Sequence, residues 1–376
     1  MLDDLRELVL CESFSADHAA VARSAEAVAA LGTRLLGTEP ETIVIDGVTH
    51  LRWRFGAPSV LLVGHHDTVW PMGSLQDHPW SLADGIARGP GVLDMKAGLV
   101  QLFHALAALP SPDGVCVLVN GDEEVGSPTS RQLIEESARD AVAAFVLEAA
   151  ADDTGALKIA RKGTSRYEVV VHGRAAHAGQ EPHKGINAAV EAAHQVLAIA
   201  GLGVATGAAD ASGSLLGPAT VTPTLVSAGS SRNTVPALAR VSVDVRVPTP
   251  AAQDRVDELV RGLTARTPGA RLEVLGGGQR PPMEPESSAE LFALASRIAA
   301  ELGQEPLRGL AVGGASDGNY TAAAGCPTLD GLGAVGGGAH ADTEHVEVAR
   351  MVPRTRLLAQ LIARTRQRPD RVSGGR

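Results

Sequence analysis

Imidazole and carboxylate side chains gather at five places in this sequence of 376 residues: 64–69, 89–96, 120–127, Glu148 and 336–340. None of these places holds a cysteine, so the available ligand atoms are nitrogen and oxygen. This is the ligand set of hydrolytic zinc, and it also suits manganese or cobalt. Two histidines with three or four carboxylates exceed what one catalytic zinc needs, and they suit two metal ions that share a bridging carboxylate. The residue types therefore predict a two-metal hydrolytic site.

Three of these places come directly after apolar runs that we interpret as buried strands, at 59–63, 115–119 and 143–147. Helical patterns precede, separate and follow these strands, at 3–10, 16–35, 96–109, 129–136, 288–302 and from Val352 onward. Strands and helices that alternate in this way predict an α/β fold with a mostly parallel sheet, covered on both faces. Because such sheets bind ligands at the carboxyl ends of their strands, we expect the polar segments to converge in one cleft. The loop at 314–319 is expected to border that cleft.

The pattern of predicted strands and helices changes after residue 162. Strand and helix patterns follow in the order βαββαβ, which is typical of a ferredoxin-like α+β sandwich, at 167–172, 185–200, 219–226, 239–247, 251–266 and 271–275. Gly276-Gly277-Gly278 and Pro281-Pro282 are interpreted as the hinge that leaves this sandwich. We therefore expect a discontinuous α/β domain at 1–162 and 281–376, interrupted by an inserted domain at 163–280.

Composition excludes several classes of function. The 33 basic and 43 acidic residues give a net charge of −10, which disfavours binding to nucleic acid or to an anionic membrane surface. Aromatic residues make up 3% of the chain, too few for a base-stacking platform. No run of 18 apolar residues predicts a membrane span, and the start of the chain lacks a signal-peptide pattern. Three scattered cysteines fit reduced thiols, so we expect a cytoplasmic protein.

Four motifs resemble those of the dinuclear-zinc metallopeptidase and aminoacylase family, which includes glutamate carboxypeptidase, acetylornithine deacetylase and succinyl-diaminopimelate desuccinylase. The matching segments follow in the family's order, at 65–69, 89–96, 122–127 and 338–340. The resemblance implies a zinc-exopeptidase-like catalytic domain with an inserted lid and dimerisation domain. The run 335–340 and the match at Arg280 favour the glutamate carboxypeptidase-like branch.

The resemblance implies a ligand set for two zinc ions per subunit, for which cobalt or manganese can substitute. His65 and Glu148 would bind one ion, while Glu124 and His340 would bind the other. Asp94 would bridge the two ions. The resemblance also implies a cis peptide bond between Asp94 and Met95.

The resemblance further assigns catalytic and substrate-binding roles. Asp67 would orient the His65 imidazole, and Glu123 would be the general base. His177 would reach the active site of a partner subunit and polarise the scissile carbonyl group, which implies a homodimer formed through the inserted domain. Arg280 and Asn233 would bind the free α-carboxylate of the substrate.

Some of these roles have alternatives. Glu148 could be a solvated carboxylate at a strand end, His177 a surface histidine and Arg280 part of a hinge salt bridge. The main hypothesis is a two-zinc hydrolase that removes a C-terminal amino acid or cleaves an N-acyl amino acid. The alternative is a deacylase of amino-acid biosynthesis, acting on an N-acyl or carrier-protein-linked intermediate. A catalytically silent homologue is disfavoured because Glu123 and every implied ligand are present.

Overall fold

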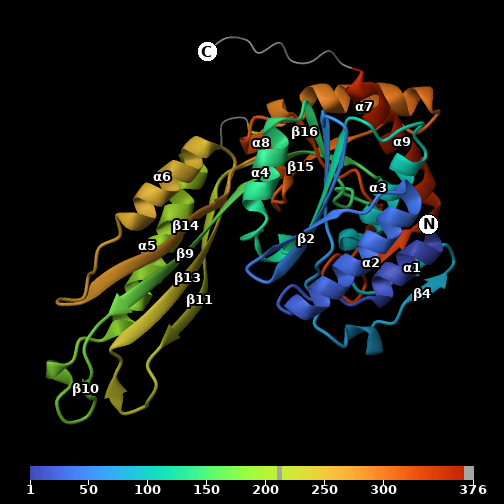
Figure 1. Ribbon diagram of the computed structural model, residues 1–376. Coiled ribbons are helices and arrows are strands. Elements are labelled where there is room, and N and C mark those ends of the chain that lie inside the picture. The colour runs from blue at the N-terminus through green and yellow to red at the C-terminus, as the bar shows by residue number, and fades with distance from the viewer. Residues whose placement is uncertain (210–213, 368–376) are drawn as a thin grey trace. The chain divides into compact units, whose positions relative to one another are not determined.

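The chain divides into two compact units in the computed structural model, which describes residues 1–209 and 214–367 (Figure 1). Unit 1 comprises Met1–Ala160, Met283–Val312 and Ser316–Arg376, and unit 2 comprises Arg161–Pro282 and Gly313–Ala315. Each unit has its own hydrophobic core. No helix in the described ranges is long and apolar enough to cross a membrane.

A six-stranded sheet forms the centre of unit 1. Its strands lie in the order β1 (Glu41–Ile45), β2 (Val48–Phe55), β6 (Val115–Asn120), β3 (Val60–His65), β7 (Ala143–Val146) and β16 (Thr328–Leu329). The pairs β6–β3, β3–β7 and β7–β16 are parallel, which confirms the predicted α/β fold with a mostly parallel sheet. The β1–β2 hairpin was not predicted, and it joins the sheet through antiparallel pairing of β2 with β6.

Helices cover both faces of this sheet, as Figure 1 shows. The larger core contains Leu62 of β3 and packs under one group of helices: α1 (Leu2–Leu10), α2 (His18–Leu36), α3 (Ala97–Ala107), α7 (Ala289–Glu301) and α9 (Val348–Arg366). Leu61 and Val63, the neighbours of Leu62, face the opposite side and pack under α4 (Arg131–Arg139) and α8 (Gly318–Ala323). This alternation explains why the strand is apolar at every position, because each face of the sheet meets a core.

Short strands complete unit 1. A four-stranded sheet has the order β17 (Gly336–Gly337), β18 (His345–Glu347), β5 (Ile86–Arg88) and β4 (Ser81–Ala83). This small sheet joins the segment after residue 335 to the segment that precedes the glycine-rich loop at 89–96. The chain leaves unit 1 along β8 (Leu157–Arg161), which pairs with β15 (Gly309–Val312).

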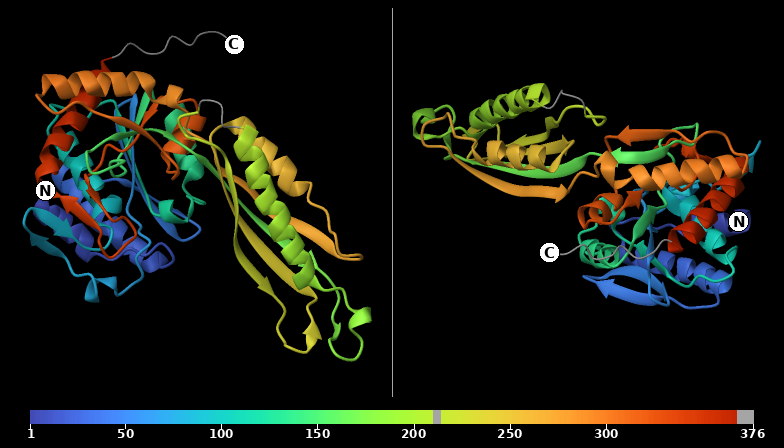
Figure 2. Two further views of the ribbon diagram at one scale, coloured as in Figure 1. Left: turned by 180° about the vertical axis from the view of Figure 1, so that it is seen from behind. Right: turned by 90° about the horizontal axis from the view of Figure 1, so that it is seen from above.

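Unit 2 is a βαββαβ sandwich. Its elements are β9 (Gly163–His172), α5 (Ala188–Ala209), β11 (Thr220–Ala228), β13 (Leu238–Val247), α6 (Pro250–Arg261) and β14 (Arg271–Arg280). The strands pair antiparallel in the order β11-β13-β9-β14, which is the ferredoxin-like arrangement. Figure 2 shows α5 and α6 side by side on the sheet, where they cover its apolar face. A small pair of strands, β10 (Ala176–His177) and β12 (Thr234–Val235), adds to one end of unit 2.

The predicted hinge at Gly276-Gly277-Gly278 is wrong, because these glycines lie inside β14. At Gly276 φ is +85°, and an added Cβ atom would lie 2.2 Å from the carbonyl oxygen of Arg166 on β9. Glycine therefore lets the two strands approach closely and continue pairing, with a register shift between Gly278 and Arg280. Arg280 is consequently the last residue of a strand.

Candidate metal centre

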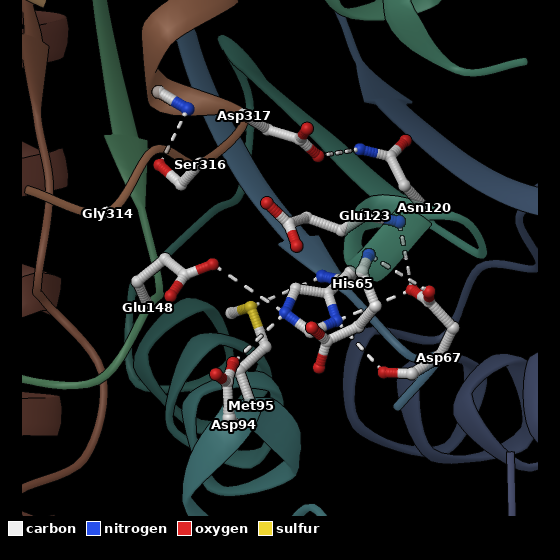
Figure 3. A network of polar contacts seen from close by, with 12 residues as sticks. His65, Asp67, Asp94, Met95, Asn120, Glu123, Glu148, Gly314, Ser316 and Asp317 are labelled. Carbon is white, nitrogen blue, oxygen red and sulfur yellow. Dashed lines mark hydrogen bonds and ion pairs between the residues drawn. The ribbon is translucent and has the colours of Figure 1, made fainter. Parts of the chain in front are cut away.

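The polar segments of unit 1 meet at the carboxyl ends of the parallel strands. His65 ends β3 and pairs in register with Asn120, which ends β6. Glu148 follows β7 by two residues, and Asp94 lies in the short turn η2 (Val92–Lys96) that leads into α3. Figure 3 shows His65, Asp94, Glu123 and Glu148 facing a common centre.

Asp94 presents its two carboxylate oxygens to two different histidines. Its Oδ1 atom lies 3.2 Å from Nε2 of His65, and its Oδ2 atom lies 3.2 Å from Nε2 of His340. A second carboxylate accompanies each histidine, with Glu148 Oε1 at 3.6 Å from His65 Nε2 and Glu124 Oε2 at 3.4 Å from His340 Nε2. Two ligand atoms on a tetrahedral zinc ion, each about 2.0–2.1 Å from it, are about 3.3 Å apart. The spacing of these side chains therefore fits two zinc ions with Asp94 between them.

The peptide bond between Asp94 and Met95 is cis, which confirms that expectation. The turn that carries Asp94 also sits unusually close to the end of β7. Gly98, in the first turn of α3, lies so near the residue that follows β7 that an added Cβ atom would lie 2.1 Å from the carbonyl oxygen of Leu147. The absence of a side chain at Gly98 thus allows the Asp94 turn to approach Glu148.

Asp67 contacts both the imidazole of His65 and the turn that carries Glu123. Its Oδ1 atom lies 3.4 Å from His65 Nδ1, while the Asp67 carbonyl oxygen accepts the closer hydrogen bond from Nδ1 at 3.0 Å. The same carboxylate accepts the backbone N–H groups of Glu123 (3.1 Å) and Glu124 (3.2 Å) and the hydroxyl of Ser15 (2.7 Å). Since Nδ1 donates to a carbonyl oxygen, Nε2 of His65 is the atom that faces the centre.

The electrostatics of the centre favour cations. Burial would lower the pKa of His65, but its carboxylate partners raise that pKa well above the ordinary value. Hydrogen bonds to Asp94 and Glu124 raise the pKa of His340 to about 10. Burial, opposed in part by His340, raises the pKa of Glu124 to about 7. All three raised pKa values favour the protonated form of a group that lies among several carboxylates. Divalent cations can replace these protons as the positive charge of the centre.

Glu123 is buried beside the first histidine. One of its carboxylate oxygens lies within 4.8 Å of the ligand atoms of His65 and Glu148. Its backbone is fixed by Asp67, so its side chain projects from a restrained turn, η3 (Glu123–Val125). A carboxylate in this position can take a proton from a water molecule held at the centre.

Glu344 is a residue of this centre that the sequence analysis missed. Its side chain is 3% exposed and accepts four hydrogen bonds. Three come from backbone N–H groups of the Asp94 turn, at Gly91 (3.0 Å), Leu93 (2.8 Å) and Asp94 (3.1 Å). The fourth comes from the indole of Trp70 at 2.7 Å. Because Glu344 follows His340 by four residues, its carboxylate ties the segment after His340 to the turn that carries Asp94.

Asp317 holds the segment that carries Glu123 and Glu124 in place. Its carboxylate accepts hydrogen bonds from the Asn120 amide (2.7 Å) and from the Ser127 hydroxyl, so it joins both ends of the segment that carries Glu123 and Glu124. From the sequence, Asp317 is expected only as part of a loop beside the cleft. Lys158, also missed, places its ammonium group 3.7 Å from Oε2 of Glu148.

The remaining predicted site residues belong to unit 2. His177 lies in β10, where its Nδ1 atom accepts the backbone N–H groups of Gly179 (3.2 Å) and Gln180 (3.0 Å), so the neutral ring carries its proton on Nε2. The carbonyl oxygen of Asn233 accepts a hydrogen bond from the backbone N–H of Ala178 at 2.9 Å, so this residue is a close neighbour of His177. Arg280 lies on β14 opposite Thr164, at the other end of β9 from His172.

Known proteins resemble this chain in sequence and in fold. Residues 61–364 match the sequence profile described as Peptidase family M20/M25/M40. Carboxypeptidase G2 from Pseudomonas sp. (strain RS-16) is 32% identical over 82% of this chain and 74% of its own length. Succinyl-diaminopimelate desuccinylase from Acidiphilium cryptum (strain JF-5) is 29% identical over 90% of this chain and 91% of its own length.

Among solved structures, an M20 family metallo-carboxypeptidase from Sulfolobus solfataricus has the same fold. It superposes with a TM-score of 0.81 over 97% of this chain and 99% of its own, at 16% identity. The profile match and the two relatives indicate the same family, and the geometry of the centre is consistent with it. This protein belongs to peptidase family M20/M25/M40 and is a hydrolase that acts on amide bonds.

Proposed function

We propose that this enzyme is a two-zinc hydrolase that releases a C-terminal amino acid or removes an acyl group from the nitrogen of an amino acid. The observation that carries the proposal is the position of Asp94, which offers one oxygen to each of two histidine–carboxylate pairs. In addition, a buried glutamate, Glu123, lies beside the centre but outside those pairs. The similarity to carboxypeptidase G2 supports the same class of reaction.

Two sets of residues that share Asp94 would hold the two zinc ions. His65 and Glu148 would complete the first set, and Glu124 and His340 would complete the second. Cobalt or manganese ions can bind to the same nitrogen and oxygen atoms. When bound, the two ions supply a water molecule of lowered pKa and stabilise negative charge on the oxygen of the scissile carbonyl.

Glu123 is the proposed general base. Its carboxylate takes the proton from the attacking water and later delivers it to the nitrogen of the departing amine. Asp67 assists by positioning, because it holds the N–H groups of Glu123 and Glu124 while it faces the imidazole of His65. One carboxylate thereby fixes the base relative to a ligand from each set.

Arg280 is proposed to bind the free α-carboxylate of the substrate, because a planar guanidinium group can donate two parallel hydrogen bonds to a carboxylate. Both a C-terminal peptide residue and an N-acyl amino acid carry this group. The alternative reaction is removal of a succinyl group from an N-succinyl amino acid. The similarity to succinyl-diaminopimelate desuccinylase over nine-tenths of both chains supports this alternative. The two reactions differ in the group on the other side of the amide bond.

The dimensions of unit 2 support a dimer. Arg280 pairs with Thr164 and Arg271 pairs with His172, so eight residues of β9 separate the two ends, or about 26 Å at 3.3 Å per residue. His177 and Asn233 lie beyond the His172 end. A small substrate held by Arg280 therefore cannot reach His177 or Asn233 of the same subunit. We propose that a second copy supplies these two residues, with the Nε2–H group of His177 donating to the scissile carbonyl.

The proposed dimer interface lies on β11 and α5. β11 is an edge strand, and its Leu225 and Val226 are 70% and 56% exposed. α5 packs beside β11 and exposes Val190 (48%) and Leu197 (71%), which lie seven residues apart on one helix face. An edge strand with apolar neighbours is suited to pairing with its own copy around a two-fold axis.

Replacing the general base tests the mechanism. Glu123→Gln should reduce kcat by about 10²–10⁴-fold, because the amide cannot accept the proton of the attacking water. The zinc content of the variant, measured by atomic emission, should remain at the wild-type value. Glu7→Gln, at an exposed position on α1, is the control. Turnover at the wild-type rate in zinc-loaded Glu123→Gln would contradict the proposed role.

Replacing Glu344 tests whether this residue positions the Asp94 turn. In Glu344→Gln one acceptor oxygen becomes an NH₂ group that faces N–H donors, so we expect zinc to bind more weakly. Each buried N–H left without an acceptor should also cost about 1–3 kcal/mol of unfolding free energy. Competition titration with a zinc chelator and urea unfolding of the zinc-free protein measure the two effects. Glu347→Gln, at the partly exposed N-cap of α9, is the matched control and should behave as wild type. Equal zinc affinity in both variants would rule out the positioning role.

Replacing Arg280 tests recognition of the α-carboxylate. Arg280→Lys keeps the charge but loses the planar pair of donors, so kcat/KM for a dipeptide or N-acyl amino acid should fall by about 10- to 150-fold. The same substrates with a C-terminal amide should be affected much less. Steady-state kinetics on such matched pairs measure the difference. A uniform loss on acids and amides alike would assign Arg280 to another role. The same panel separates peptide from N-succinyl and other N-acyl substrates.

Two measurements test the dimer. Leu225→Glu should give monomers in analytical ultracentrifugation, whereas Leu302→Glu, at an exposed leucine of unit 1, should leave the mass unchanged. Mixing inactive His177→Ala and Glu123→Ala subunits should restore about a quarter of wild-type activity, since half of the dimers are mixed and each has one intact site. A fully active monomer, or no restored activity after verified subunit exchange, would exclude a contribution from the partner.

A further inference from the structure

A second concave site lies in unit 1 at the beginning of α9. Its cavity has a volume of ≈ 630 Å³, and three chain segments line it, at 154–155, 303–308 and 350–354. The charged residues of the lining are Arg308, Arg350 and Arg354 against a single carboxylate, Glu305. None of the residues proposed to bind zinc or substrate belongs to this lining.

Arg354 is a buried cation without a carboxylate partner in the described parts of the chain. Its guanidinium group donates to the carbonyl oxygens of Gly155 (2.7 Å), Gly333 (3.0 Å) and Gly331. Burial, together with the nearby charge of Arg350, lowers the pKa of Arg354 to about 10. Carbonyl dipoles satisfy its hydrogen bonds but leave its net charge uncompensated.

Arg350 adds a second cation to the same wall. Its Nη2 atom donates to the carbonyl oxygen of Thr154 at 2.7 Å, one residue before the carbonyl that binds Arg354. A Cβ atom placed on Gly155 would lie 2.8 Å from Nη2 of Arg350 and 3.7 Å from Nη1 of Arg354, so the two guanidinium groups flank this glycine. No carboxylate within residues 1–209 and 214–367 forms an ion pair with Arg350. Arg308, the third cation, forms an ion pair with Asp152, with 3.5 Å between its Nη1 atom and Oδ2 of Asp152.

The direction of α9 increases the positive potential. Arg350 and Arg354 lie in the first two turns of this helix, at the positive end of its dipole, where acidic residues are normally favoured. The first turn contains no acidic residue, and the N-cap residue Glu347 makes no capping hydrogen bond through its side chain. Two cations thus sit at the end of the helix that repels them, beside an open cavity.

We propose that this cavity binds a compact oxyanion with two or more negative charges, of the phosphate or small polycarboxylate class. Arg350 and Arg308 would donate to the anion from the open side, and Arg354 would supply charge from the wall. Guanidinium groups suit such anions because they offer paired, planar N–H donors.

Calorimetric titration of the zinc-loaded enzyme tests the site. Inorganic phosphate and citrate are the two probes, each compared with sodium chloride at equal ionic strength to remove general screening. The wild type should bind one of the two probes saturably, and the probe bound more tightly identifies the class. Arg350→Gln and Arg308→Gln should each weaken binding by about tenfold, the loss of one charge-assisted pair. Arg139→Gln, at an exposed arginine of α4, is the control and should bind as the wild type does.

Three results would overturn the proposal. The wild type could fail to bind either probe above the chloride background. Alternatively, both arginine variants could bind with wild-type affinity, which would place the anion elsewhere, including at the zinc ions. Finally, Arg139→Gln could lose as much affinity as the cavity variants, which would indicate a general charge effect. Circular dichroism melting of each variant verifies that it is folded before titration.

Discussion

The arrangement of the candidate metal centre depends on holding one carboxylate, that of Asp94, between two imidazoles. His65 comes from the end of a central strand and His340 from a loop late in the chain, so this contact spans most of the sequence. Several carboxylates crowd the same small volume, and their repulsion opposes the arrangement. Hydrogen bonds hold the surrounding turns in place against that repulsion: backbone N–H groups of Glu123 and Glu124 donate to Asp67, and those of the Asp94 turn donate to Glu344.

The sequence was sufficient to predict the fold class, because its signals are local. Fully apolar strands such as β3 identify a sheet covered on both faces, and the βαββαβ order identifies the sandwich of unit 2. Local signals were also ambiguous in places. Three consecutive glycines resemble a hinge, but at Gly276 they serve a close strand–strand approach. The β1–β2 hairpin turns at Asp46-Gly47, a typical two-residue turn in which both residues have a positive φ. Its strand β2 is largely buried but mixes polar with apolar residues, so it does not form a fully apolar run like that of β3.

Long-range contacts explain what was missed at the centre. His65, Glu123 and Glu148 lie at or just after the ends of the neighbouring parallel strands β3, β6 and β7, so strand order alone brings them near one another. Glu344 binds N–H groups about 250 positions earlier in the chain, and Asp317 binds side chains nearly 200 positions earlier. No spacing rule links such partners. For Glu344 the only hint was its place four residues after His340, and for Asp317 its place in a loop expected beside the cleft.

The length of β9 has a consequence for how the enzyme behaves in a cell. Since one copy of unit 2 cannot place Arg280 and His177 on the same small substrate, each catalytic centre in the proposed dimer combines residues from two chains. Catalysis then obeys the law of mass action for subunit association, and specific activity falls on dilution below the dimer dissociation constant. The amount of chain synthesised would therefore set both the number of centres and the fraction of them that is complete.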